Sequence, residues 1–134
     1  MTMTQSVPEM PTSWEGSEPE WVTFIILQQL GKVPDTDFTY QSPLMGGRLD
    51  KGGAIVDFMF KNPPDLAINV QGNYYHYGMG VETKTRDILA RVQLATQGII
   101  LIFIDEDHLE DNPTYYIREA LRYRDHSRLG GMGL

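Results

Sequence analysis

Residues 54–71 read AIVDFMFKNPPDLAINVQ, and this stretch determines the fold that the sequence predicts. Apolar and polar side chains alternate along 54–60 and again along 66–71, which is typical of β-strands with one face in a core. The Asn-Pro-Pro-Asp segment between them is a turn. We therefore predict two neighbouring strands of one meander, joined by a short loop.

The alternation also predicts which side chains share a face. In the first strand Val56 and Phe58 point to one side and Asp57 to the other, and in the second strand Asn69 and Gln71 lie opposite the apolar residues. A slip of one residue would turn a whole strand over, so the apolar faces must share one core. Asp57 then lies on the same face as Asn69 and Gln71, which requires a three- or five-residue loop, or a bulge, between the strands.

Outward from this pair, periodicity and capping residues predict the other elements. Ser17 and Glu20 form a capping box at the start of a helix, and Gly31 ends that helix. The remaining elements, in chain order, are a strand over 37–41, a Gly-rich loop over 45–53, an aromatic loop over 72–80, a helix over 82–97, a strand over 99–104 and a helix from Asn112-Pro113 to about Asp125.

The order of the elements is α-β-β-β-α-β-α. The third and fourth strands are joined by a helix, so they should be parallel. We predict an α/β fold with a four-stranded mixed sheet flanked by helices. One domain covers residues 17–126, with a flexible tail over 1–16 and a flexible Gly-rich tail over 127–134.

Composition excludes several classes of protein. The chain has 134 residues, 11 Lys and Arg against 18 Asp and Glu, a net charge of −7 and no Cys. The lack of Cys excludes a disulfide scaffold, a Cys zinc site and a Cys nucleophile, and it fits a reducing, cytoplasmic compartment. The longest uncharged apolar stretch, 98–104, is too short to span a membrane. An acidic chain binds nucleic acid poorly unless it has a local basic face.

A carboxylate in the middle of a strand needs an explanation, because Asp is rare there and costly to bury alone. Asp57 is either a metal ligand at the sheet edge or an Asp that is paired with a Lys or Arg or bonded to backbone. The acids between 105 and 111 lack the spacing of a calcium loop, and we interpret them as a solvated loop. His108 and His126 are interpreted as surface residues.

Two helices offer candidate interfaces. The first helix is apolar on nearly all sides, so it is either deeply buried or meets a partner, which could be a second copy or a component of an assembly. On the last helix Arg118 and Arg122 lie one turn apart and share a face. This face either binds a polyanion such as DNA or is simply solvated.

Three groups of residues occur in a familiar order: Pro19-Glu20, Val56-Asp57-Phe58 and the run INVQGNYYH at 68–76. In these motifs the chain resembles the PD-(D/E)XK nuclease superfamily, and within it the very-short-patch-repair endonucleases. The resemblance covers about residues 17–125. It implies a restriction-endonuclease-like αβββαβ core and the metal-dependent cleavage or nicking of DNA phosphodiester bonds.

The resemblance also implies roles for single residues. Asp57 would hold Mg²⁺ or Mn²⁺ together with the backbone carbonyl of Val70, and Glu20 would reach the metal through water. His76 would act as general acid or base, with Gln71 at the edge of the same catalytic group. The family's DNA-wedging aromatic residues fall on two tyrosines, and the predicted nucleic-acid-binding residues are Tyr74, Tyr75, Arg48, Lys51, Arg118 and Arg122.

Departures from the family leave a second class of function open. Asn69 and Gln71 replace the acid and the Lys of the superfamily, and Gln71 stands where the repair enzymes have His. A Gln side chain cannot accept a proton at neutral pH. We favour a magnesium-dependent endonuclease; the alternative is a catalytically inactive nuclease-fold module that binds or supports a larger, for example viral, assembly.

Overall fold

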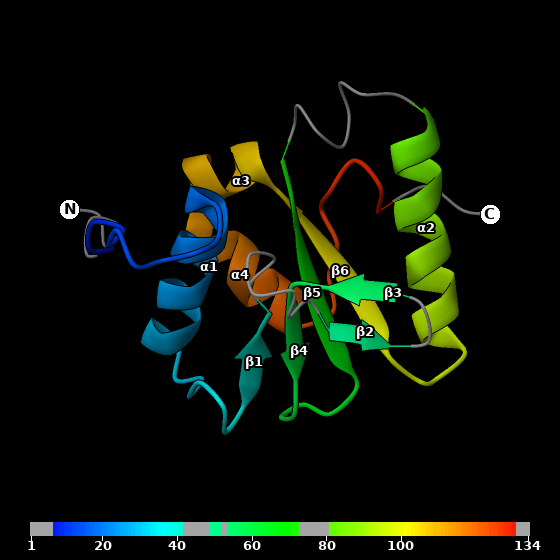
Figure 1. Ribbon diagram of the computed structural model, residues 1–134, viewed down its shortest axis with the longest axis horizontal. Helices are drawn as coiled ribbons and strands as arrows, with labels where there is room; N and C mark the ends of the chain where they lie inside the picture. Colours follow the sequence, from blue (N-terminus) through cyan, green and yellow to red (C-terminus); the bar gives the residue numbers. More distant parts are fainter. Residues whose placement is uncertain (1–6, 42–48, 52–53, 73–80, 131–134) are drawn as a thin grey trace.

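The structure, a computed structural model, describes residues 7–41, 49–51, 54–72 and 81–130. A four-stranded sheet with strand order β1-β4-β5-β6 forms its centre (Figure 1). Strands β4 and β5 pair antiparallel, as do β1 and β4, whereas β5 and β6 pair parallel. The predicted α/β fold with a mixed sheet is thereby confirmed. The strand bounds are β1 Phe38–Tyr40, β4 Phe58–Phe60, β5 Leu66–Gln71 and β6 Ile100–Asp105.

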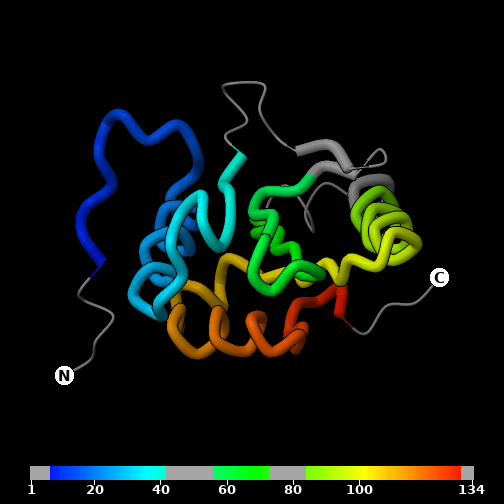
Figure 2. Tube along the Cα trace, turned by 90° about the horizontal axis from the view of Figure 1, so that it is seen from below, coloured from blue at the N-terminus to red at the C-terminus, as the bar shows by residue number. Residues whose placement is uncertain are grey.

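Helices cover both faces of the sheet. Three of them, α1 (Glu18–Gln29), α3 (Glu106–Asp111) and α4 (Pro113–Leu121), lie together on one side, and α2 (Val81–Ala95) lies on the other (Figures 1 and 2). Within the described ranges, no helix combines the length and the apolar character that crossing a membrane would need.

Each face of the sheet has its own core. Successive residues of β5 and β6 point to opposite faces, so a strand that is apolar throughout serves both layers. The first core lies under α1, α3 and α4 and includes Ile26, Leu27, Phe58, Ile68, Ile102 and Ile117. The second core lies under α2 and includes Val56, Ala67, Ile88, Leu94, Leu101, Phe103 and Leu129.

The predicted ends of α1 and the predicted start of α4 are confirmed. The Ser17 hydroxyl accepts a hydrogen bond from the Glu20 N–H, and the Glu20 carboxylate accepts one from the Ser17 N–H at 3.0 Å. Beyond the other end of α1, Gly31 adopts a φ of 95°, a conformation in which a Cβ is strained. Asn112 caps α4 by accepting a hydrogen bond from the Tyr115 N–H.

The predicted continuous strand over 54–60 is wrong, because the chain bends at Asp57. Residues before the bend form β3 (Ala54–Val56), which pairs with β2 (Leu49–Lys51) in a separate two-stranded sheet. Val56 therefore belongs to the second core, although alternation placed it beside Phe58. Beyond the bend the predicted register is correct: Phe58 pairs with Ile68, and a five-residue loop joins the strands.

Two further expectations need correction at the C-terminal side of the chain. The acids between 105 and 111 are not a solvated loop: Asp105 ends β6 with 0% of its surface exposed, and the others form the short helix α3. Helix α4 ends at Leu121, before the predicted end near Asp125.

At the N-terminal side, Trp14 stacks on Tyr40 with 4.6 Å between the ring centroids, so residues before α1 contact the sheet.

Candidate functional site

The carboxyl ends of β5 and β6 carry two buried polar side chains, and a third lies beside β5 at the bend between β3 and β4. Gln71 and Asp105 are register partners in the parallel pair and are 1% and 0% exposed. Asp57, on the other side of β5, is 2% exposed. Ligands of α/β proteins commonly bind outside the carboxyl ends of parallel strands. This edge is therefore the candidate functional site.

Asp57 is held by hydrogen bonds to neighbouring strands. One carboxylate oxygen accepts a hydrogen bond from the Val70 N–H at 3.0 Å, and the Asp57 N–H donates to the Asn69 side-chain oxygen at 2.7 Å. The Asp57 carbonyl accepts a bond from the Gln41 N–H. The Asp57 carboxylate thus binds the Val70 N–H, which in a regular sheet would bond to a backbone carbonyl of the neighbouring strand. This accounts for the bend between β3 and β4. Of the two alternatives for Asp57, a carboxylate bonded to backbone is confirmed. The metal role stays a prediction.

Gln71 connects β5 to helix α2. Its amide nitrogen donates a hydrogen bond to the Asp87 carboxylate at 3.2 Å. Lys84 lies one helical turn before Asp87 and is half-buried, so the same side of α2 carries an acid and a cation near the edge of the sheet. Asp57 is bonded through its N–H to the side chain of Asn69, two residues before Gln71, and the predicted proximity of Gln71 and Asp57 stays a prediction.

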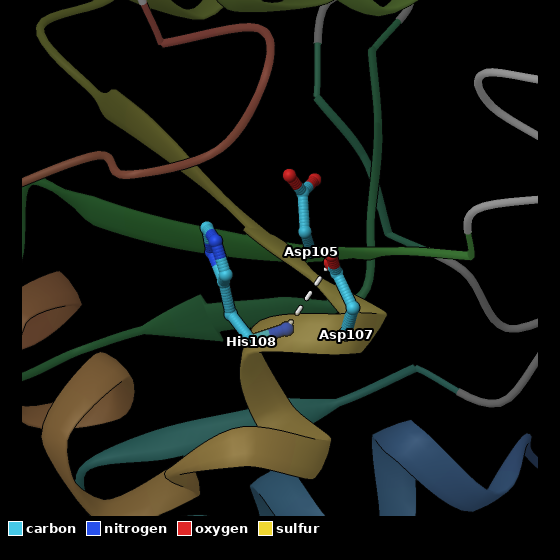
Figure 3. Close-up of side chains that lie close together, drawn as sticks. All are labelled: Asp105, Asp107 and His108. Atoms are coloured by element: carbon cyan, nitrogen blue, oxygen red, sulfur yellow. Dashed lines mark hydrogen bonds between the residues drawn. The ribbon is translucent and has the colours of Figure 1, made fainter.

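Beyond the end of β6, Asp105, Asp107 and His108 form a compact group (Figure 3). One potential metal-ligand atom from each lies within 4.8 Å of the other two, and in the part of the chain that the structure describes this is the only such group of three. Arg128 already supplies a cation there, with guanidinium contacts of 3.1 Å to Asp105 and 2.8 Å to Asp107. The hydrogen bond from Arg128 holds the pKa of Asp107 below its usual value.

His108 is a member of this group, and its ring also packs against α4. The ring stacks on Tyr116 with 4.3 Å between centroids, and its Nδ1 is buried with no hydrogen-bond partner among the described residues. Arg128 offsets both carboxylates, so Asp105 and Asp107 are satisfied as an ion-pair cluster.

Glu20 lies on α1, which covers the opposite face of the sheet from α2. Its carboxylate completes the capping box and also accepts a hydrogen bond from the Tyr40 hydroxyl at 2.8 Å. Within the described ranges, Glu20 and Asp57 do not share a three-residue ligand group. The predicted approach of Glu20 to a metal at Asp57 stays a prediction.

The other predicted site residues fall in three groups. Arg118 and Arg122 lie on the exposed side of α4. Lys51 lies on β2 and pairs with Ala54, and its side chain lies outside what the structure describes. The predicted residues that lie wholly outside the described ranges are Arg48, Tyr74, Tyr75 and His76.

Sequence reasoning did not single out Asp87, Asp105 or Arg128 as members of this edge. Asp105 had a usable signal, since an acid directly after an apolar run marks the end of a central strand. Nothing in the sequence signals the contacts of Asp87 with Gln71 and of Arg128 with Asp105, because these depend on how α2 and the C-terminal segment return to the sheet.

Comparison with family models, curated proteins and solved structures finds no match for this chain. The resemblance to the PD-(D/E)XK nucleases therefore rests on the motifs at 19–20, 56–58 and 68–76. The geometry of the edge is the independent basis for a functional proposal.

Proposed function

We propose that the protein is a metal-dependent endonuclease whose Mg²⁺ or Mn²⁺ ion binds at Asp57, at the carboxyl end of β5. The observation that carries this proposal is the buried Asp57 carboxylate, which the bend between β3 and β4 directs at the backbone of Val70. Burying a carboxylate is costly, and here the chain interrupts a strand at the residue that carries one.

The donor atoms at this position suit a hard cation. Carboxylate and carbonyl oxygens are the ligands that Mg²⁺ prefers. The N–H and C=O of one residue in a strand point to the same neighbouring strand, so the Val70 carbonyl lies on the same side of β5 as Asp57. An ion bound there offsets the charge of a phosphodiester and activates water.

The surrounding residues have supporting roles in this proposal. Gln71 orients Asp87 through their hydrogen bond, and Lys84 on the same side of α2 can contact a phosphate oxygen. His76, in the aromatic loop, would transfer the proton. Glu20 would act on the site indirectly, by fixing the start of α1 and the Tyr40 side chain.

A second candidate is the catalytically inactive nuclease-fold module. The observation that favours it is that the polar groups of the edge bond to one another: Gln71 to Asp87, and Asp105 to Arg128. Satisfied polar groups can hold a fold together without any ligand. In this case Asp57 serves only to shape the bend.

The test is cleavage of supercoiled and single-stranded DNA with Mg²⁺ or Mn²⁺ by the full chain and two matched variants. Asp57→Asn should lower the cleavage rate by more than about 100-fold, since loss of even a second-shell group at a metal site costs 10–100-fold. Asp111→Asn makes the same change at an exposed carboxylate and should leave the rate unchanged.

Thermal unfolding of the same variants separates the two candidates. A nuclease loses activity in Asp57→Asn while the fold persists. The inactive module shows no cleavage with either metal, and Asp57→Asn is then neutral or stabilising, because an unneeded buried charge is removed. That second pattern would overturn the nuclease proposal.

A further inference from the structure

A second polar surface lies on the outer side of α4 and on the segment that follows it. We call it the basic-aromatic face. Its members are all exposed, with 44% of Tyr115, 59% of the Arg122 and Arg124 side chains and 39% of the His126 side chain open to solvent. The five residues of the face are Tyr115, Arg118, Arg122, Arg124 and His126.

These side chains form one continuous surface. Tyr115 and Arg118 on α4 and Arg122, the C-cap residue of that helix, follow one another at intervals of three and four residues. The His126 ring lies 5.9 Å from the ring of Tyr115. Arg124 and His126 both bond to the Glu119 carboxylate at 3.0 Å, which brings the end of the segment back against the helix.

The face is positive, although the whole protein is negative. Among the described residues, two of its three guanidinium groups, those of Arg122 and Arg124, pair with one carboxylate, Glu119. The hydrogen bond from His126 keeps the pKa of Glu119 below its usual value, so this carboxylate stays ionised. Arg118 is exposed, and among the described residues it makes no ion pair or side-chain hydrogen bond. In a chain with a net charge of −7, this face is a place where a polyanion can approach.

The basic-aromatic face is separate from the candidate site at Asp57. Helix α4 covers the first core, whereas Gln71 and Asp87 lie on the α2 side of the sheet (Figure 2). The end of α4 is also at the opposite end of β5, because the Tyr123 hydroxyl bonds to Asp65, just before that strand begins. A six-residue strand is roughly 17–20 Å long.

We propose that the basic-aromatic face binds single-stranded nucleic acid, with Arg118 and Arg122 at the phosphates and Tyr115 stacked on an unpaired base. Exposed rings between cations suit single strands, whose bases are free to stack, better than duplexes, whose bases are already stacked. An acidic polypeptide would use the charges but not the ring. The inference goes beyond the proposed nuclease, because this binding needs no metal.

The first test measures binding of a fluorescein-labelled oligothymidylate of about 20 nucleotides, longer than the usual site of roughly 4–16. Fluorescence anisotropy is recorded in EDTA over a range of salt concentrations. Arg118→Ala should weaken binding and reduce the slope of log K against log salt by about 0.7, the value for one lost contact to a single-strand phosphate. Lys61→Ala removes an exposed cation from the loop after β4 and should change neither quantity.

The second test concerns the ring. Tyr115→Leu should weaken binding by about 5- to 150-fold without changing the salt slope, because stacking is not ionic. Tyr115→Phe keeps the ring and should bind like the protein without substitutions. A base-paired hairpin of equal length should bind more weakly and should not respond to Tyr115→Leu.

Three results would overturn the inference: no binding of the oligonucleotide, equal effects of Arg118→Ala and Lys61→Ala, or displacement by polyglutamate as effective as by unlabelled oligonucleotide. Oligonucleotide binding by Asp57→Asn separates this proposal from the nuclease proposal. If that variant binds normally and neither protein cleaves, the nuclease proposal fails and this one stands.

Discussion

At the scale of single residues, Gly16 shows how closely the start of α1 fits the sheet. A Cβ on Gly16 would overlap the Tyr40 hydroxyl and would lie 2.6 Å from the Glu20 carboxylate. The Tyr40–Glu20 hydrogen bond therefore depends on the absence of a side chain at position 16.

Gly16→Ala should displace the Tyr40 hydroxyl and lower the free energy of unfolding by about 1–3 kcal/mol, because the buried Glu20 carboxylate loses a partner. Urea denaturation measures the loss. In a Tyr40→Phe background the hydroxyl is already absent, so most of the effect of Gly16→Ala should disappear. Additive effects of the two changes would contradict this explanation.

The contact between Arg128 and Asp107 leads to a second prediction, about how stability depends on pH. Its guanidinium lowers the pKa of Asp107 in the folded state below the usual 3.8. A carboxyl with a lowered folded pKa contributes stability that is present above its unfolded pKa and is lost as the pH falls through the folded value. The full chain should therefore lose stability as the pH falls below about 3.8, and Arg128→Gln should flatten this part of the curve.

Arg128→Gln should also lower stability near neutral pH by roughly 1–3 kcal/mol, because the buried Asp105 loses its guanidinium partner. Melting temperatures measured between pH 2 and 7 at constant ionic strength test both effects. Identical curves for the two proteins would show that the ion pair contributes nothing. Arg122→Gln, whose closest carboxylate contact is 3.9 Å, is the matched control.

At the scale of elements, Asn112 decides where α4 begins. Its side chain accepts a hydrogen bond from the Tyr115 N–H, and Pro113 follows as the first helical residue. Asn112→Ala should cost about 1 kcal/mol, the usual effect of losing such a cap. Asn112→Ser keeps an acceptor and should cost less. Thermal unfolding of the two variants compares them directly, and equal melting temperatures would contradict a role for the cap.

Caps and alternation are local signals, and the elements that depend on them were predictable. The capping box at Ser17, the cap at Asn112 and the parallel pairing of β5 with β6 all follow from short stretches of sequence. The pairing of Phe58 with Ile68 across β4 and β5 followed from alternation in the same way.

The missed features depend on contacts between distant segments. The bend at Asp57 arises because its carboxylate takes the Val70 N–H, which a pattern of apolar and polar residues does not record. The acids after β6 looked like a loop by charge, but Asp105 and Asp107 are offset by Arg128, which is far away in the sequence. The burial of Asp105 and the pairing of both carboxylates with Arg128 were therefore not predictable from local composition.

At the scale of the whole molecule, the segment 124–130 protects an open edge of the sheet. Strand β6 is the last strand in the order β1-β4-β5-β6, so one side of its backbone has no strand partner within that sheet. The Asp125 carboxylate accepts a hydrogen bond from the Phe103 N–H at 2.9 Å, on this edge. Exposed edges of apolar strands are sites of aggregation, and covering them is a common solution.

Leu129 fixes this segment to the second core. It is 0% exposed, and its carbonyl accepts a hydrogen bond from Arg91 of α2 at 2.8 Å. Leu129→Ala should therefore lower the free energy of unfolding by about 2–5 kcal/mol, as expected for a buried leucine. Leu89→Ala makes the same change at a position that is 51% exposed and should cost much less.

Removal of residues 124–134 tests the edge itself. Without Asp125 and Leu129, the β6 backbone and its apolar neighbours meet solvent, so the shortened chain should be less stable than Leu129→Ala and should self-associate as its concentration rises. Analytical ultracentrifugation and urea denaturation measure the two effects. Because Leu129→Ala keeps the Asp125–Phe103 hydrogen bond, it should lose stability without self-association. A shortened chain that stays monomeric and as stable as the full chain would show that residues 124–134 are a dispensable tail and that the edge of β6 needs no cover.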